Sequence, residues 1–154
     1  TPCGTLFPYT TLFRSEAEMP QDFLNTLQYE VAAKYTEMLE HIRHSWVLKN
    51  GNALGWQLMD QSMEKMRHLA HFAEDVAENG QTPDFSAAEY SQSKDPATAL
   101  RSSLKRLQGG LKRHKELKDH EETGKHAGLV LNLDLTLKQE QYQEGEITDW
   151  IGKM

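Results

Sequence analysis

The spacing of apolar residues constrains the fold of this chain more than any other feature. Over residues 21–49 these side chains recur at intervals of three and four, which places them on one face of an α-helix. Pro20 precedes the segment, and Asn50-Gly51 supplies a stop. The spacing therefore predicts a long amphipathic helix over 21–49. Its apolar positions are Leu24, Leu27, Val31, Tyr35, Met38, Leu39, Ile42 and Trp46.

The same spacing predicts a second helix over 53–78, which ends at Asn79-Gly80. A loop rich in proline, serine and aspartate follows. A third helix begins at Pro96, because proline is favoured in the first turn of a helix, and it carries leucines at helical intervals. A glycine pair inside this helix weakens it by roughly 1 kcal/mol per glycine relative to alanine. The apolar positions of the second helix are Leu58, Met59, Met63, Met66, Leu69, Ala70, Ala73, Val76 and Ala77.

The last segment carries two conflicting patterns. Five leucines alternate strictly over 129–137, which is the period of a strand, yet no second strand-like run exists for it to pair with. Residues 139–144 are good helix formers. A helix over 128–150 is predicted, with a strand at 129–137 as the alternative. Long helices joined by short connections predict an all-α, antiparallel, up-down-up-down four-helix bundle.

The first fifteen residues stand apart from this pattern. Residues 5–15 match the in-frame translation of a common short-read sequencing adaptor, so 1–15 is interpreted as an artefactual, disordered tail. One domain is then predicted over 16–154, with Met19 as a candidate natural start. Cys3, the only cysteine, lies in the tail, so no disulfide framework or thiol nucleophile is expected.

Charge and hydropathy limit the classes of function. The formal net charge is −6, which disfavours general binding of nucleic acid and suits a protein that attracts cations. No apolar run approaches about 18 residues, so no membrane span is expected and a cytoplasmic location is predicted. Basic residues on the third helix offer a nucleic-acid surface, although a solvated face paired with neighbouring acids is favoured. They are Arg101, Lys105, Arg106, Lys112, Arg113, Lys115 and Lys118.

One short motif points to metal chemistry. A Glu-x-x-His pair on a helix directs both side chains to the same face, as in the di-iron sites of helical bundles. The second helix contains His68, but the position three residues before it is Lys65. Glu64 lies one turn before His68 and offers a carboxylate in a different register. The motif therefore resembles a di-iron motif that lacks one acidic ligand.

With these segments in order, the chain resembles the ferritin-like superfamily over nearly all of residues 22–151. Leu24-Asn25 followed by Glu30 is similar to the entry of the first helix in ferritins and bacterioferritins. The run from Met63 to His68 is similar to their second helix. Gly124-Lys125-His126-Ala127 resembles the turn between the third and fourth helices, and Glu140-Gln141-Tyr142-Gln143-Glu144 resembles the metal-facing run of the fourth.

The resemblance implies a metal site and a function. Its positions fall on Glu30, Lys65, His68, Gln108, Gln141 and Glu144, of which Lys65 and Gln108 replace acids. The predicted metal ligands are Glu30, Glu64, His68, Gln141 and Glu144, with a di-iron cofactor. The implied function is oxidation and storage of iron by a homo-oligomer, with ferroxidase activity. The alternative is a catalytically inactive ferritin-like scaffold that acts by oligomer assembly or by binding a partner.

The chain also resembles a second branch of the superfamily, which implies a different set of positions for the metal site. His44-Ser45-Trp46-Val47 and the run from Ala73 to Gly80 resemble Dps-like mini-ferritins, whose sites lie between subunits. Glu74 matches the glutamate of that site and His44 roughly matches its histidine, but Ala70 stands at the aspartate position.

Helical periodicity leaves three interpretations of the polar residues. At 100 degrees per residue, Glu30, Lys34, Glu37, His41, Glu64 and His68 lie off the apolar stripes, so the plain interpretation is a solvated face. The second interpretation gives each helix two buried faces, with a non-standard metal set of Glu30, Glu37, His41, Glu64, His68 and His71. In the third, Lys65 fills the vacated site and pairs with Glu30 or Glu144. His114, His120 and His126 are predicted at the surface or at helix ends.

Overall fold

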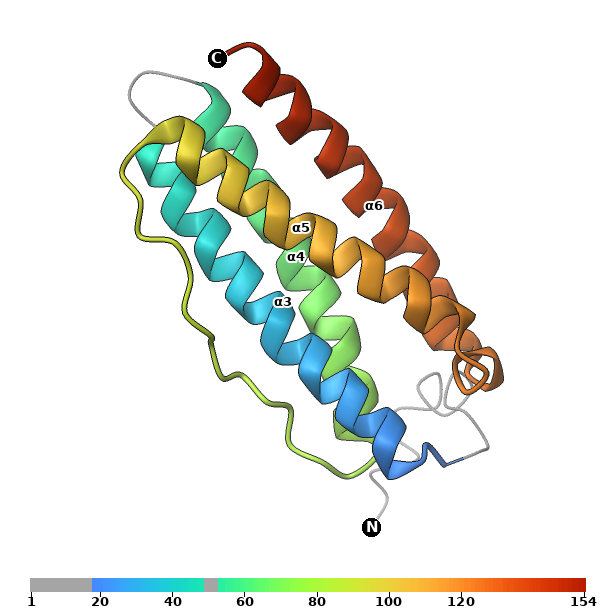
Figure 1. The fold of residues 1–154 in the computed structure, drawn as a ribbon. Coiled ribbons are helices and arrows are strands. Elements are labelled where there is room, and N and C mark those ends of the chain that lie inside the picture. Colours follow the sequence, from blue (N-terminus) through green and yellow to red (C-terminus); the bar gives the residue numbers. More distant parts are fainter. Residues whose placement is uncertain (1–17, 49–52) are drawn as a thin grey trace.

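Four long helices form a single bundle in the computed structural model, which describes residues 18–48 and 53–154 (Figure 1). They are α3 (Gln21–Val47), α4 (Ala53–Glu78), α5 (Pro96–Asp119) and α6 (Ala127–Gly152), with a short 3-10 helix, η1 (Thr123–Lys125), before the last. The all-α antiparallel bundle is therefore confirmed. The strand alternative at 129–137 is wrong, because these leucines lie within α6. The predicted tail at 1–15 lies outside the described residues.

The helix ends follow the local sequence. Gly80 closes α4 with a positive φ of 80°, a conformation that glycine adopts without steric cost. Asp95 caps α5 by accepting a hydrogen bond from the Thr98 backbone N–H at 2.9 Å, and Pro96 follows it in the first turn. No helix within 18–48 and 53–154 is long and apolar enough to cross a membrane.

The connection between α4 and α5 changes the predicted helix directions. It runs along the outside of α3 for most of its length, so that α4 and α5 point the same way and α6 runs parallel to α3 (Figure 1). Side chains of α3 hold this crossover: Thr36 Oγ1 accepts from the Ala88 backbone N–H at 3.0 Å, and Arg43 donates to the Gln92 carbonyl at 2.7 Å. The up-down-up-down order is therefore wrong, because one long crossover replaces a short turn.

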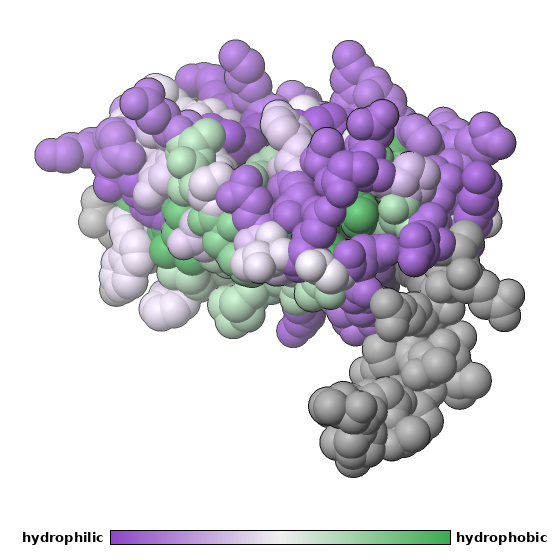
Figure 2. Space-filling view, turned by 90° about the horizontal axis from the view of Figure 1, so that it is seen from below, coloured by the Kyte–Doolittle hydropathy of each residue, from purple (hydrophilic) through white to green (hydrophobic). Residues whose placement is uncertain are grey.

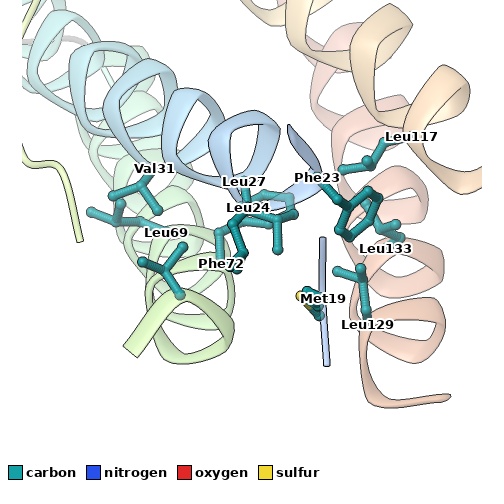
Figure 3. Close-up of a cluster of buried hydrophobic side chains, with 11 residues drawn as sticks. Met19, Phe23, Leu24, Leu27, Val31, Leu69, Phe72, Leu117, Leu129 and Leu133 are labelled. Atoms are coloured by element: carbon teal, nitrogen blue, oxygen red, sulfur yellow. The ribbon is translucent and has the colours of Figure 1, made fainter. Parts of the chain in front are cut away.

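Two apolar clusters fill the ends of the bundle. One lies near the start of α3 and contains Phe23, Leu27, Phe72 and Leu133 (Figure 3). The other, near the end of α3, contains Leu48, Leu58, Leu100, Leu107, Ile147 and Trp150. The middle of the bundle between these clusters is polar, and this layer is the candidate functional site.

Candidate functional site: a buried ion-pair layer

The polar layer continues the helical register of the two apolar clusters. On α5 the buried positions run from Leu107 through Gly110 to His114 and Leu117, at intervals of three and four. The charged residues of the layer therefore occupy positions that leucine would take elsewhere in the bundle. Its buried members are Glu30, Lys34, Glu37 and His41 of α3, Lys65 and His68 of α4, His114 of α5, and Glu140 and Gln143 of α6.

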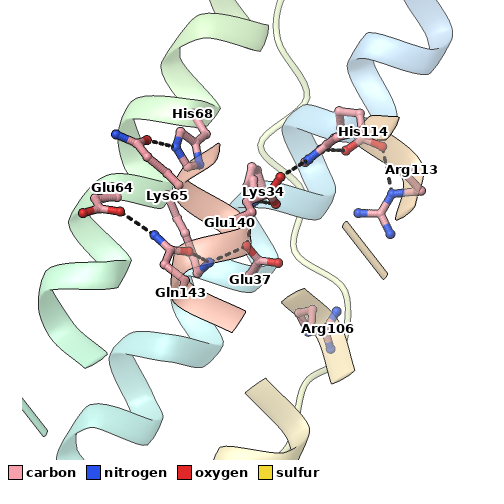
Figure 4. A network of polar contacts seen from close by, with 12 residues as sticks. Lys34, Glu37, Glu64, Lys65, His68, Arg106, Arg113, His114, Glu140 and Gln143 are labelled. Atoms are coloured by element: carbon pink, nitrogen blue, oxygen red, sulfur yellow. Dashed lines mark hydrogen bonds and ion pairs between the residues drawn. The ribbon is translucent and has the colours of Figure 1, made fainter. Parts of the chain in front are cut away.

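Two lysines meet one carboxylate oxygen at the centre of this layer (Figure 4). Lys34 Nζ lies 2.7 Å from Glu37 Oε1 and 2.7 Å from Glu140 Oε2. Lys65 Nζ lies 2.8 Å from the same Glu37 Oε1 and donates to Gln143 Oε1 at 2.8 Å. Glu37 thus bridges two side-chain cations, and each cation has a second oxygen partner on α6.

His114 joins Glu140 to a further carboxylate, Glu30. Its Nδ1 lies 2.6 Å from Glu140 Oε1, and its Nε2 lies 2.7 Å from Glu30 Oε2. Ionised carboxylate oxygens only accept hydrogen bonds, so both ring nitrogens donate and the side chain is an imidazolium. The other oxygen of Glu30 accepts from Arg113 Nε at 2.8 Å, which extends the layer towards the surface of α5.

The pKa values of the acids follow from these contacts. Burial alone raises the pKa of Glu37, but attraction to Lys34 and Lys65 outweighs it and holds the pKa well below its usual value. Burial also opposes ionisation of Glu140, yet Lys34 and His114 lower its pKa to about 2. These carboxyl groups are therefore ionised at neutral pH.

The pKa values of the basic groups shift in different directions. Burial lowers the pKa of His114, but hydrogen bonds to Glu140 and Glu30 raise it above its ordinary value overall. Two carboxylates likewise raise the pKa of Lys34 against the effect of burial. For Lys65 burial prevails and the pKa is lowered, because this lysine contacts one carboxylate and lies near the charge of Lys34.

The contacts form one continuous chain across all four helices. Four basic side chains and four carboxylates take part, so the layer is electrically balanced without any further ion. From α5 to α4 the order is Arg113, Glu30, His114, Glu140, Lys34, Glu37, Lys65, Gln143 and Glu64.

The structure brings together only part of the predicted metal set. Glu30 and His68 are buried in the layer, and Glu64 reaches its edge by accepting a hydrogen bond from Gln143. Gln141 is exposed and Glu144 is half-buried, so neither joins the contacts of the layer. Glu140 and Gln143, one residue earlier on the helix, project inwards instead.

On α5 the inward position is a glycine rather than the predicted glutamine. Gln108 is exposed, whereas Gly110 is buried against the layer. A Cβ atom at Gly110 would lie 3.4 Å from Glu140 Oε2 and 3.5 Å from Glu37 Oε2. These are ordinary van der Waals distances, so the two carboxylates lie directly beside the α5 backbone at Gly110.

The interpretation of the polar residues as a solvated face is wrong. On α3 and α4 they line the bundle centre, as the interpretation with two buried faces expected, while Met63 and Met66 of the predicted apolar stripe are exposed. The ion pair predicted for Lys65 is confirmed, but its partner is Glu37 and not Glu30 or Glu144.

The remaining histidines fall into different environments. His114 is fully buried, which contradicts its predicted surface position. His41 is also fully buried next to Glu37, and burial lowers its pKa well below the usual value, so its ring is neutral. His44 contacts Ser103 Oγ at 2.7 Å, whereas Glu74, its partner in the Dps-like register, is exposed on α4.

The residues of the layer do not fit a di-iron centre. Such a centre needs several carboxylates around two cations, and here the ammonium groups of Lys34 and Lys65 already occupy the space between the acids. Within 18–48 and 53–154, no three side chains of His, Cys, Asp or Glu are placed to share one metal ion.

Helix order, the long crossover and an inward-facing polar layer define a ferritin-like four-helix bundle. The sequence matches no protein-family model and no curated protein. Bacterioferritin from Rhodobacter capsulatus, solved with a metal-free dinuclear site and haem iron, is similar in structure, with a TM-score of 0.78 at 12% identity over 88% of this chain and 87% of that one. A ferritin-like diiron-carboxylate protein from Bacillus anthracis gives a TM-score of 0.77 at 16% identity over 85% and 96% of the two chains.

Proposed function

We propose that this chain is a self-assembling ferritin-like subunit that does not oxidise iron at the bundle centre. The observation that carries assembly is a second face on α4, separate from the buried one. Its residues recur at alternating intervals of three and four, which is the spacing of a helix-pairing seam. The members of this α4 seam are Met59, Met63, Met66, Ala70, Ala73 and Ala77. Met63 is 49% exposed and Met66 is 45% exposed.

The order of side chains along the α4 seam favours a second copy of the same chain as its partner. Large residues occupy the first half and alanines the second. If two α4 helices pair antiparallel about Met66, then Met63 faces Ala70 of the other copy and Met59 faces Ala73. Apart from Met66, which meets its own copy at the axis, each of these large side chains therefore meets a small one, and such self-complementarity is what a two-fold interface requires. Seen from below, the molecule has pale and apolar side chains gathered towards its lower edge, while hydrophilic ones cover its upper edge (Figure 2).

The assembly proposal predicts the effect of one charge in the α4 seam. Met66→Asp places two carboxylates against each other at the two-fold axis, and we expect the dissociation constant of the pair to rise by about 100-fold or more. Sedimentation equilibrium measures this change. Leu135→Asp is the matched control, because Leu135 is similarly exposed, at 48%, but lies on α6. It should keep the wild-type pairing. A monomeric wild type, or a Met66→Asp protein of unchanged mass, contradicts the proposal.

A second proposal keeps an iron function for the assembled protein. It is supported by the fold, since the similar bacterioferritin and diiron-carboxylate protein are described by their metal sites. Because no three His, Cys, Asp or Glu side chains within the described part of one subunit are placed to share an ion, iron would then be bound between subunits, at carboxylates that more than one subunit contributes. His71, Glu74, Asp75 and Glu78 line a surface depression of about 270 Å³ beside α6. Burial and the charges of Glu78 and Glu74 raise the pKa of Asp75 to about 7 there.

Aerobic addition of ferrous iron separates the two proposals. We expect no fast oxidation, and equal rates from the wild type and a Glu30→Ala, His68→Ala double variant, because both residues belong to the ion-pair layer. Absorbance of ferric iron gives the rate. If the wild type oxidises iron and a Glu74→Gln, Glu78→Gln double variant oxidises it more slowly, the result supports iron binding at these surface carboxylates. A slower rate in the Glu30, His68 variant would instead overturn the proposed inactivity of the centre.

A further inference from the structure

The two ammonium groups at the centre of the layer share one carboxylate oxygen, as two bridged metal ions would. Glu37 Oε1 accepts from Lys34 Nζ at 2.7 Å and from Lys65 Nζ at 2.8 Å. The terminal partners lie one turn apart on α6, Glu140 for Lys34 and Gln143 for Lys65. The two cations therefore share one bridging oxygen, and each has an additional oxygen of its own.

Inward-facing side chains surround this pair on two neighbouring helices, α4 and α6. Lys65 and His68 project from α4 at a spacing of three, and Glu140 and Gln143 project from α6 at the same spacing. His68 donates from Nε2 to Gln139, and its Nδ1 has no hydrogen-bond partner within the described part of the chain. Three of the four positions thus carry groups that bind divalent transition metals, and only Lys65 is a cation.

We infer that the ammonium groups of Lys34 and Lys65 replace two metal ions, and that a divalent cation enters the Lys65 half of the layer only when an acid takes the place of this lysine. A divalent ion next to Glu37 would lie against a fully buried ammonium, which repels it and cannot move to solvent. Replacing Lys65 by an acid removes that repulsion and supplies a carboxylate close to Glu37, His68 and Gln143. The site so formed accepts one divalent transition ion, because Lys34 remains in the other half. This inference rests on the proposed inactivity of the native centre.

The Lys65→Glu protein tests the inference with Co²⁺, an ion whose visible absorption reports nitrogen and oxygen ligands. Without metal we expect this variant to unfold at a lower temperature than the wild type, since it adds an acid and loses a cation. At Co²⁺ about 100-fold above its dissociation constant, we expect the midpoint to rise by about 5–10 °C. About one ion should remain per chain after desalting. Lys65→Gln is the matched control, because it removes the cation without adding a carboxylate, and it should show neither effect.

The outcomes distinguish the inference from the proposed function. If Co²⁺ stabilises the wild type as much as Lys65→Glu, the native centre binds metal and both fail. If the wild type does not respond and Lys65→Glu also gains nothing, only the inference is overturned. Should Lys65→Glu not fold without metal, it is refolded from urea with Co²⁺ or with Mg²⁺. Folding with Co²⁺ alone supports the inference, and failure with both ions contradicts it.

Discussion

Replacing Lys34 by methionine is expected to lower the free energy of unfolding by about 3–5 kcal/mol, the usual cost of removing one partner from a buried ion pair. Lys34 is buried and contacts two carboxylates, Glu37 and Glu140, each at 2.7 Å. Methionine fills a similar volume but offers no charge. Both acids would then remain buried with a smaller opposing charge, and the loss comes from their desolvation rather than from a cavity.

Urea denaturation measures the change, with Lys138→Met as the control. Lys138 is exposed on α6, so its replacement should alter the free energy of unfolding by no more than about 0.5 kcal/mol. A double-mutant cycle with Glu140→Gln isolates the pair, and we expect a coupling of about 1–3 kcal/mol. A Lys34→Met protein as stable as the Lys138→Met control would mean that the layer does not depend on its central cation.

The helices and their ends were predictable because local rules determine them. Intervals of three and four located α3, α4 and α5, whereas helix-forming residues and the lack of a partner strand indicated α6. The glycine after α4 and the Asp95-Pro96 start of α5 set the boundaries of those two helices. The crossover was not predictable in the same way. Its course depends on contacts between the loop and distant side chains of α3, such as Thr36 and Arg43, and no local pattern reports them.

The location of the polar layer was missed for a specific reason. Helices α3 and α4 each carry two apolar faces, and averaging over both placed the stripe of α4 near Met66 and Ala73. The buried face of α4 passes through Leu58, Lys65, Leu69 and Val76, about 80 degrees away. Continuing the register of the buried leucines through the charged residues would have found Lys65.

The same register would have corrected the residues taken from the family resemblance. On α6, the spacing from Leu133 through Leu137 leads to Glu140, Gln143 and Ile147. The resemblance pointed to Gln141 and Glu144, which are one residue out of this register and turn away from the centre. The family resemblance thus located the correct turn of α6. The periodicity of the buried residues determines which side chains of that turn enter the bundle.

His114 should make the stability of this bundle depend on pH in the neutral to alkaline range. Its imidazolium lies between Glu30 and Glu140, with Arg113, Lys34 and the ring of Phe72 as its other neighbours. Its folded pKa is raised above the ordinary value of 6.5. The stabilising contribution is therefore fully present below that value and is lost as pH rises through the folded pKa.

We expect the free energy of unfolding of the wild type to exceed that of His114→Gln most at about pH 6, and the difference to shrink as the pH rises through the folded pKa, which lies above 6.5. Urea denaturation at a series of pH values gives both curves. Nitrogen NMR shifts of the ring report whether both nitrogens carry protons at the low end of the range. Glu30→Gln removes the negative charge from one of the two acceptors, so it should move the loss of stability to lower pH. Parallel curves for the wild type and His114→Gln across this range would show that the ring is not held as an imidazolium.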